Sequence, residues 1–174
     1  TATGMQSMLN NTTGSNNTAT GNYSLIFNTE GDKNTATGSI ALYANTTGGS
    51  NTATGTQALK SNTTGSYNTV TGNYAGDAIT TGSSNVMLGY GTDPSAADGT
   101  NQIVIGAGAT GQADNSVVLG NANVTAVYAS QDAGATLYAG ALNLGGTAVT
   151  STAAELNLLD DVTSLATNVN GLSD

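Results

Sequence analysis

The phrase "NTATG" recurs with little change, at 17–21, 34–38, 51–55 and, as "NTVTG", at 68–72. Its first threonine moves forward in a constant step of 17, through Thr18, Thr35, Thr52 and Thr69. A constant period of this length is typical of a solenoid or a fibrous array, in which each repeat stacks on its neighbours. The sequence therefore predicts stacked coils instead of one globular core.

The same step continues after the threonines have been replaced by aliphatic residues. From Thr69 it reaches "VMLG" (86–89) and then "IVIG" (103–106), and a shorter step of 14 reaches "VVLG" (117–120). Thr and Val favour strands, whereas Gly and Asn favour tight turns. Each unit is predicted to form two short strands separated by two turns. The fold class that we expect is mainly β, a repetitive parallel β-roll or β-solenoid over 1–120.

Residues i and i+2 of a strand share one face, so the aliphatic pairs predict an inward face for the whole register. The predicted inward ladder consists of Thr18, Thr20, Thr35, Thr37, Thr52, Thr54, Thr69, Thr71, Val86, Leu88, Ile103, Ile105, Val117 and Leu119. The alternative turns the threonines outward and places Ala19, Ala36 and Ala53 inside. A roll with two walls buries few side chains, and this burial barely offsets the conformational entropy lost when its residues become ordered. We therefore expect an obligate oligomer with cyclic symmetry.

Composition excludes several classes of function. The 174 residues include Lys33 and Lys60 as the only basic side chains, against eleven acidic ones, and the net charge of −9 argues against nucleic acid and anionic membranes. No apolar run is long enough to span a bilayer. The chain has no Cys and no His, which removes disulfides, the usual zinc ligands and the common nucleophile–base pairs. We therefore expect no enzymatic activity.

Carboxylates, tyrosines and a single loop supply the remaining candidate sites. Asp93 and Asp98, or Asp160 with Asp161, could form a glycosidase pair, but turn formation and charge at a helix N-terminus explain them as well. The segment "DPSAADGTN" (93–101) is a weak calcium candidate without the acidic spacing of a calcium loop. Tyr23, Tyr43 and Tyr74 could stack on a glycan, although tyrosine is also a common strand residue.

Two short motifs carry a resemblance to known fibrous proteins. "NQIVIG" (101–106) and "NSVVLG" (115–120) resemble the head repeats of trimeric autotransporter adhesins, which implies a homotrimer of left-handed β-rolls. The longer units, such as the one at 49–72, are similar to repeats in tail-fibre and surface-fibre proteins of phages and marine microbes. The longer period of this chain departs from the compact adhesin unit, so the turns and the number of walls per coil stay open.

The C-terminal part resembles a segment of phage tail fibres that leads from β-structure into a coiled coil. The resemblance covers 141–165, with Asp161 where that family commonly has Gly. The residues themselves predict a helix over 151–174, since Thr152 and Glu155 have capping-box spacing and a heptad seam follows at Leu158, Val162, Leu165, Val169 and Leu172. The alternative is a single amphipathic helix lying on the roll. Segment 121–150 is predicted to be a β-rich connector.

Together these patterns predict a trimeric fibre shaft of a phage or virus, located on the virion and binding a cell-surface glycan or protein receptor. A bacterial surface adhesin or extracellular filament is the first alternative. The second is an ice-binding solenoid, because an outward Thr-X-Thr array resembles that of some antifreeze proteins. No cofactor is expected.

Overall fold

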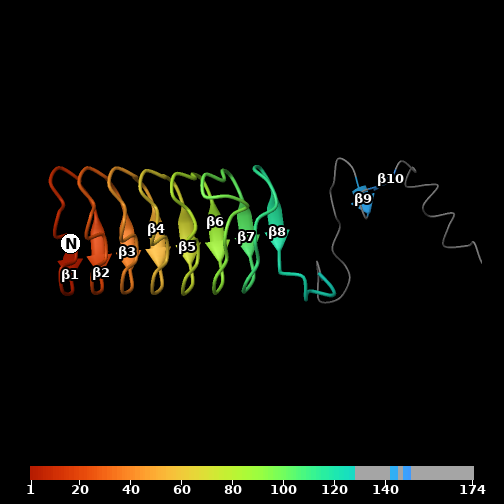
Figure 1. Ribbon diagram of the computed structural model, residues 1–174, viewed down its shortest axis with the longest axis horizontal. Helices are drawn as coiled ribbons and strands as arrows, with labels where there is room; N and C mark the ends of the chain where they lie inside the picture. The colour runs from red at the N-terminus through yellow and green to blue at the C-terminus, as the bar shows by residue number, and fades with distance from the viewer. Residues whose placement is uncertain (128–141, 145–146, 150–174) are drawn as a thin grey trace, which may run out of the picture. The chain divides into compact units, whose positions relative to one another are not determined.

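The computed structural model describes residues 1–127, 142–144 and 147–149, and its larger unit, 1–127, is a parallel β-solenoid (Figure 1). One eight-stranded sheet runs along the stacked coils in chain order. Its strands are β1 (Ala2–Thr3), β2 (Thr18–Thr20), β3 (Thr35–Thr37), β4 (Thr52–Thr54), β5 (Thr69–Thr71), β6 (Val86–Leu88), β7 (Ile103–Ile105) and β8 (Val117–Leu119). The predicted solenoid and its repeats are confirmed.

The strands pair in exact repeat register. Thr35 lies beside Thr52, and Val86 lies beside Ile103, each one full repeat further along the chain. The last pair confirms the shorter step, because Ile103 lies directly beside Val117. Parallel pairing in register stacks like upon like, so the sheet carries continuous files of equivalent side chains.

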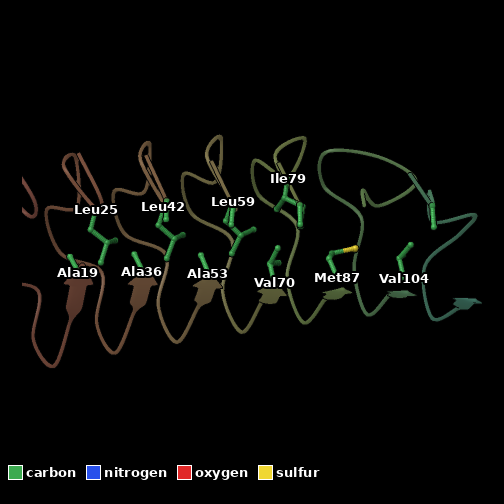
Figure 2. Close-up of a cluster of buried hydrophobic side chains, with 14 residues drawn as sticks. Ala19, Leu25, Ala36, Leu42, Ala53, Leu59, Val70, Ile79, Met87 and Val104 are labelled. Atoms are coloured by element: carbon green, nitrogen blue, oxygen red, sulfur yellow. The ribbon is translucent and has the colours of Figure 1, made fainter. Parts of the chain in front are cut away.

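The interior of the solenoid is lined by the middle residue of each strand, and Figure 2 shows these side chains in one row. Ala36, Val70 and Val104 are fully buried, whereas the residues on either side of them face outward. The prediction that the Thr-X-Thr and aliphatic pairs face the interior is therefore wrong. The alternative, with Ala19, Ala36 and Ala53 inside, is confirmed.

The narrow interior explains this orientation. In the first coils a buried leucine of the opposite wall (Leu25, Leu42 or Leu59) leaves room only for alanine on the strand. One coil later, Gly76 takes the place of the leucine in the opposite wall, and the larger Val70 takes the place of alanine on the strand. A Cβ on Gly76 would lie 3.2 Å from Val70. The two walls therefore compensate each other in volume, coil by coil.

The opposite wall contains no strand in residues 1–127, so the predicted second strand of each unit is wrong. Ala58 and Leu59 are adjacent and both fully buried, which a pleated strand with alternating faces does not allow. Gln57 and Leu59 instead adopt left-handed backbone, with φ of 60° and 51°. Hydrogen bonds still link the coils, such as the one from Leu59 N to Ala75 O at 3.0 Å.

Two files of buried asparagines hold the turns together. In the first file, each Oδ1 accepts the backbone N–H of the residue one coil later, which is Gln102 in the case of Asn85, at 2.8–3.0 Å. Each Nδ2 donates to a glycine carbonyl. The second file links side-chain amides directly, for instance Asn45 Nδ2 to Asn28 Oδ1 at 2.7 Å. The files are Asn17, Asn34, Asn51, Asn68 and Asn85, and Asn11, Asn28, Asn45 and Asn62. Except for Asn62 Oδ1, the buried polar atoms of these files are thus satisfied between coils.

The second unit, 128–174, is described only in two strands. Strands β9 (Leu142–Leu144) and β10 (Thr147–Val149) pair in antiparallel register. The predicted helix over 151–174 and its seam lie outside the described residues. In the part that is described, no helix has the length and hydropathy needed to cross a membrane.

Candidate binding face

The outward side of β1–β8 is the most regular surface of the solenoid, and we call it the strand face. It carries the first and third residue of each strand from β2 to β8, and Thr3 of the two-residue β1, in two files that run along the sheet. The files are threonine from β2 to β5 and aliphatic from β6 to β8. The exposed fractions in the aliphatic part are 38% for Val86, 47% for Leu88, 36% for Ile103, 37% for Ile105, 59% for Val117 and 51% for Leu119.

The strand face carries no charge. None of the strands β1–β8 contains an acidic or basic residue, and both lysines of the chain lie in turns. A second surface can therefore cover this face without removing any charged group from water, which would otherwise oppose the contact. The face is suited to close approach by a flat partner of matching shape.

The threonine hydroxyls of the strand face differ from those of the turns. In the turns, Thr29, Thr46 and Thr63 donate to carbonyls of the next coil at 3.0–3.2 Å. Within residues 1–127, the hydroxyls of the strand threonines form no such bond to the chain. They point outward, as the residues on either side of each buried alanine do. The threonine files therefore present hydroxyls that are free to bond water or a partner, together with methyl groups, at one surface.

The loop 93–101 carries two of the predicted carboxylates, Asp93 and Asp98. Burial raises the pKa of Asp93, although the N–H of Ala78 that it accepts opposes this effect, and Asp77 raises it further. Within residues 1–127, no hydrogen bond joins Asp98 to Asp93. Residues 1–127 hold no group of three or more carboxylates close enough to bind a metal ion. Asp160 and Asp161 lie outside the described residues.

A second carboxylate of this region has a structural partner. The pKa of Asp114 is lowered by the backbone N–H of Thr100, at 2.8 Å, and by the side-chain amide of Gln102, at 3.0 Å. Gln102 occupies the place of an asparagine of the first file, and its longer side chain reaches Ser95 and Asp114 across the shorter last coil. These contacts close the coil that ends the repeats.

The five tyrosines of residues 1–127 lie in the turns, and three of them make edge-to-face aromatic contacts. Phe27 and Tyr43 meet edge to face at 5.0 Å between ring centroids, and Tyr74 and Tyr90 at 6.2 Å. Such pairs stabilise neighbouring coils. Tyr23 and Tyr67 have no aromatic partner within residues 1–127, and Tyr67 is 68% exposed.

Residues 1–127 thus form a parallel β-solenoid whose uncharged strand face changes from threonine to aliphatic. No family model, curated protein or solved structure matches the chain. The residues of this face are those of the predicted ladder, but on the opposite side of the sheet. Sequence reasoning gave the buried asparagines only a turn-forming role, although their strict recurrence once per repeat is the signal that could have identified the ladders.

Proposed function

We propose that the chain is a shaft segment of a homotrimeric fibre, in which the strand faces of three solenoids meet around a common axis. The observation that carries the proposal is the exposed aliphatic part of the strand face. Aliphatic side chains gathered at one flat, uncharged surface are typical of a surface that is covered by a partner. A second copy of the same face is a natural cover, because its files have the same spacing.

The energetic reason is simple. Burying each half-exposed Val, Leu or Ile contributes about 1 kcal/mol to the free energy of association. Every chain supplies such residues from three successive coils. The threonine part of the face would then be polar packing, with hydroxyls bonding across the axis. Such a trimer has two kinds of core: one inside each solenoid, built from the middle residues, and one shared between chains. The resemblance to adhesin and tail-fibre repeats supports the number three and a left-handed winding.

A shaft of this kind would hold a binding tip at a distance from a virion or cell surface. Parallel stacking sets its length by the number of coils, and the shared core makes unfolding of one chain expose the others. A phage or virus tail fibre is the first assignment, and a bacterial surface adhesin or filament is the alternative.

The first prediction concerns the mass in solution. The chain has a mass of 17.0 kDa, so light scattering should give three times this value for a trimer. Replacing Ile105 by Lys should raise the dissociation constant by about a hundredfold or more, because three unpaired ammonium groups would enter the shared core. Thr64→Lys, at an exposed turn position, is the matched control and should leave the mass unchanged. A wild-type mass equal to that of a single chain would refute the proposal.

The outward threonines favour ice binding as a second candidate function. Four coils present Thr-X-Thr in register, with rows about 4.8 Å apart and side chains about 6.7 Å apart along each strand. Such a regular grid of hydroxyls and methyl groups resembles the ice-binding array of some antifreeze proteins. Ice binding requires an uncovered strand face, whereas the trimer covers it. The two proposed functions therefore exclude each other at this surface.

The second prediction applies if the chain is a monomer in solution. In that case the wild-type chain should show thermal hysteresis, and Thr37→Lys should reduce it strongly by placing a hydrated charge in the middle of the grid. Lys at the turn position Thr64 should have no effect. A monomer without thermal hysteresis would remove ice binding from consideration.

A further inference from the structure

We propose that a notch in the turn edge of the solenoid binds a single neutral sugar unit. The notch lies beside Gly49, and none of its residues belongs to a strand. It has a volume of about 310 Å³, near the lower end of the range of about 300–1,000 Å³ that is usual for small-molecule sites. Its other lining residues are Glu30, Asp32, Lys33, Thr47, Ser50, Ser66 and Tyr67. The inference does not depend on the fibre proposal.

The notch arises from a missing side chain in a regular column. The column contains Ser15, Asp32, Gly49, Ser66, Ser83, Thr100 and Asp114, one residue per coil. At four steps the side chain of one coil accepts the backbone N–H of the coil before it, at 2.5–3.1 Å. Gly49 has no side chain to offer to Asp32. The backbone N–H of Asp32, like that of Ser83 further along the column, therefore has no side-chain acceptor in the next coil.

The groups around this N–H match the chemistry of a sugar ring. A pyranose carries hydroxyls on its rim, each able to donate and accept, and C–H groups on its faces. The carboxylates of Glu30 and Asp32 accept hydrogen bonds, the ammonium of Lys33 donates, and the hydroxyl of Ser50 does both. Tyr67 offers a 68% exposed aromatic ring for the apolar face.

The charges select against other ligands of the same size. Two carboxylates disfavour a phosphate, sulfate or acidic sugar, because like charges at close range repel. One lysine among them, and no third carboxylate in the lining, disfavours a divalent cation. A neutral, hydroxylated ring satisfies all of these groups at once, including the N–H of Asp32.

Gly49 also provides a precise test. Its φ is not in the left-handed region, and an added Cβ would lie 3.2 Å from Asp32 O, a tight contact that a shift of a few tenths of an ångström relieves. The hydroxyl of Gly49→Ser would occupy the notch and accept the N–H of Asp32, as Ser66 and Ser83 do for their neighbours. This variant closes the site while completing the column. Tyr67→Ala removes the aromatic wall, and Tyr74→Ala is its control outside the notch.

The experiment is a titration of the ¹⁵N-labelled full chain with methyl glucoside, galactoside and mannoside, followed by TROSY spectra. The expected result is a saturable shift of the Asp32, Ser50 and Tyr67 amides with at least one glycoside. Gly49→Ser and Tyr67→Ala should weaken binding by about tenfold or more, and Tyr74→Ala should not change it. Retained spectral dispersion will show that the variants are folded. Absence of a saturable shift with all three glycosides, or binding that survives Gly49→Ser, would overturn the proposal.

Discussion

Replacing Gly55 by Ala should lower the free energy of unfolding by about 3–5 kcal/mol, a large effect for a single methyl group. Gly55 ends strand β4 with φ of +134°, a conformation that L residues rarely adopt. A Cβ at this position would also be driven into the carbonyl group of Gly72 in the next coil, with its carbon at only 2.6 Å. Because the clash is with backbone, the coils would have to separate.

Two further glycines distinguish the strain from the clash. Gly91 has φ of +55° and no atom within 4 Å of an added Cβ, so Gly91→Ala should cost only about 1–2 kcal/mol. Gly49→Ala has no left-handed strain, and its added Cβ would lie 3.2 Å from Asp32 O without overlapping it, so stability should change by less than about 1 kcal/mol in either direction. Urea unfolding at one fixed protein concentration measures all three, since association contributes to stability. Equal losses for Gly55→Ala and Gly91→Ala would show that coil contact is not the cause.

Non-glycine residues in this fold show why the strand-end glycines are special. Sixteen of them have positive φ in the described part, all between 49° and 62°, for example Tyr23, Ile40 and Leu59. The turns thus tolerate ordinary left-handed backbone even at large residues. The glycines that end β2 to β7 lie instead between +130° and +145°. That region, together with contact between successive coils, requires glycine.

The repeat, its period and the parallel register could be predicted from sequence, because each follows from the spacing of identical motifs. The orientation of the strands could not be inferred from Val86 and Leu88 alone, since aliphatic residues were assumed to face inward. The middle column carries the better signal. It is apolar in every coil, through Ala53, Val70, Met87 and Val104, whereas its flanks change from Thr to aliphatic.

Other features depend on contacts that a single repeat does not reveal. No strand forms around Leu59 because the adjacent Ala58 and Leu59 are both buried. Their burial depends on the side chains of the opposite wall. The notch at Gly49 is recognised only when its missing side chain is compared with the side chains that neighbouring coils have in the same column. In both cases the deciding neighbour lies one coil away in space.

The second asparagine file ends at Asn62, and its end leaves one buried oxygen without a hydrogen bond. Asn62 Oδ1 is the one buried side-chain polar atom of the described residues that has no hydrogen-bond partner. An asparagine one repeat later would supply it, but that place is taken by the fully buried Ile79. A file of this type links each Oδ1 to the next Nδ2, so wherever it ends, one acceptor is left over.

Replacing Asn45 by Ile should therefore be much more damaging than replacing Asn62 by Ile. Asn45→Ile breaks the file in the middle: Asn28 Oδ1 loses its donor at 2.7 Å, and Asn62 Oδ1 stays without a partner. Two buried acceptors are then unsatisfied, and the free energy of unfolding should fall by about 2–4 kcal/mol. Asn62→Ile only ends the file one coil earlier, leaving Asn45 Oδ1 in place of Asn62 Oδ1, and should cost less than about 1 kcal/mol.

The double variant makes this argument decisive. With both asparagines replaced, Asn28 Oδ1 is the single unsatisfied acceptor of the file, so adding Asn62→Ile to Asn45→Ile should restore stability by about 1–3 kcal/mol. A mutation that is neutral or slightly destabilising alone would thus stabilise the damaged chain. Urea unfolding of the four proteins of the cycle, at equal concentration, measures the coupling. Additive losses would mean that the file acts as independent pairs, because only a continuous file makes the cost depend on where it ends.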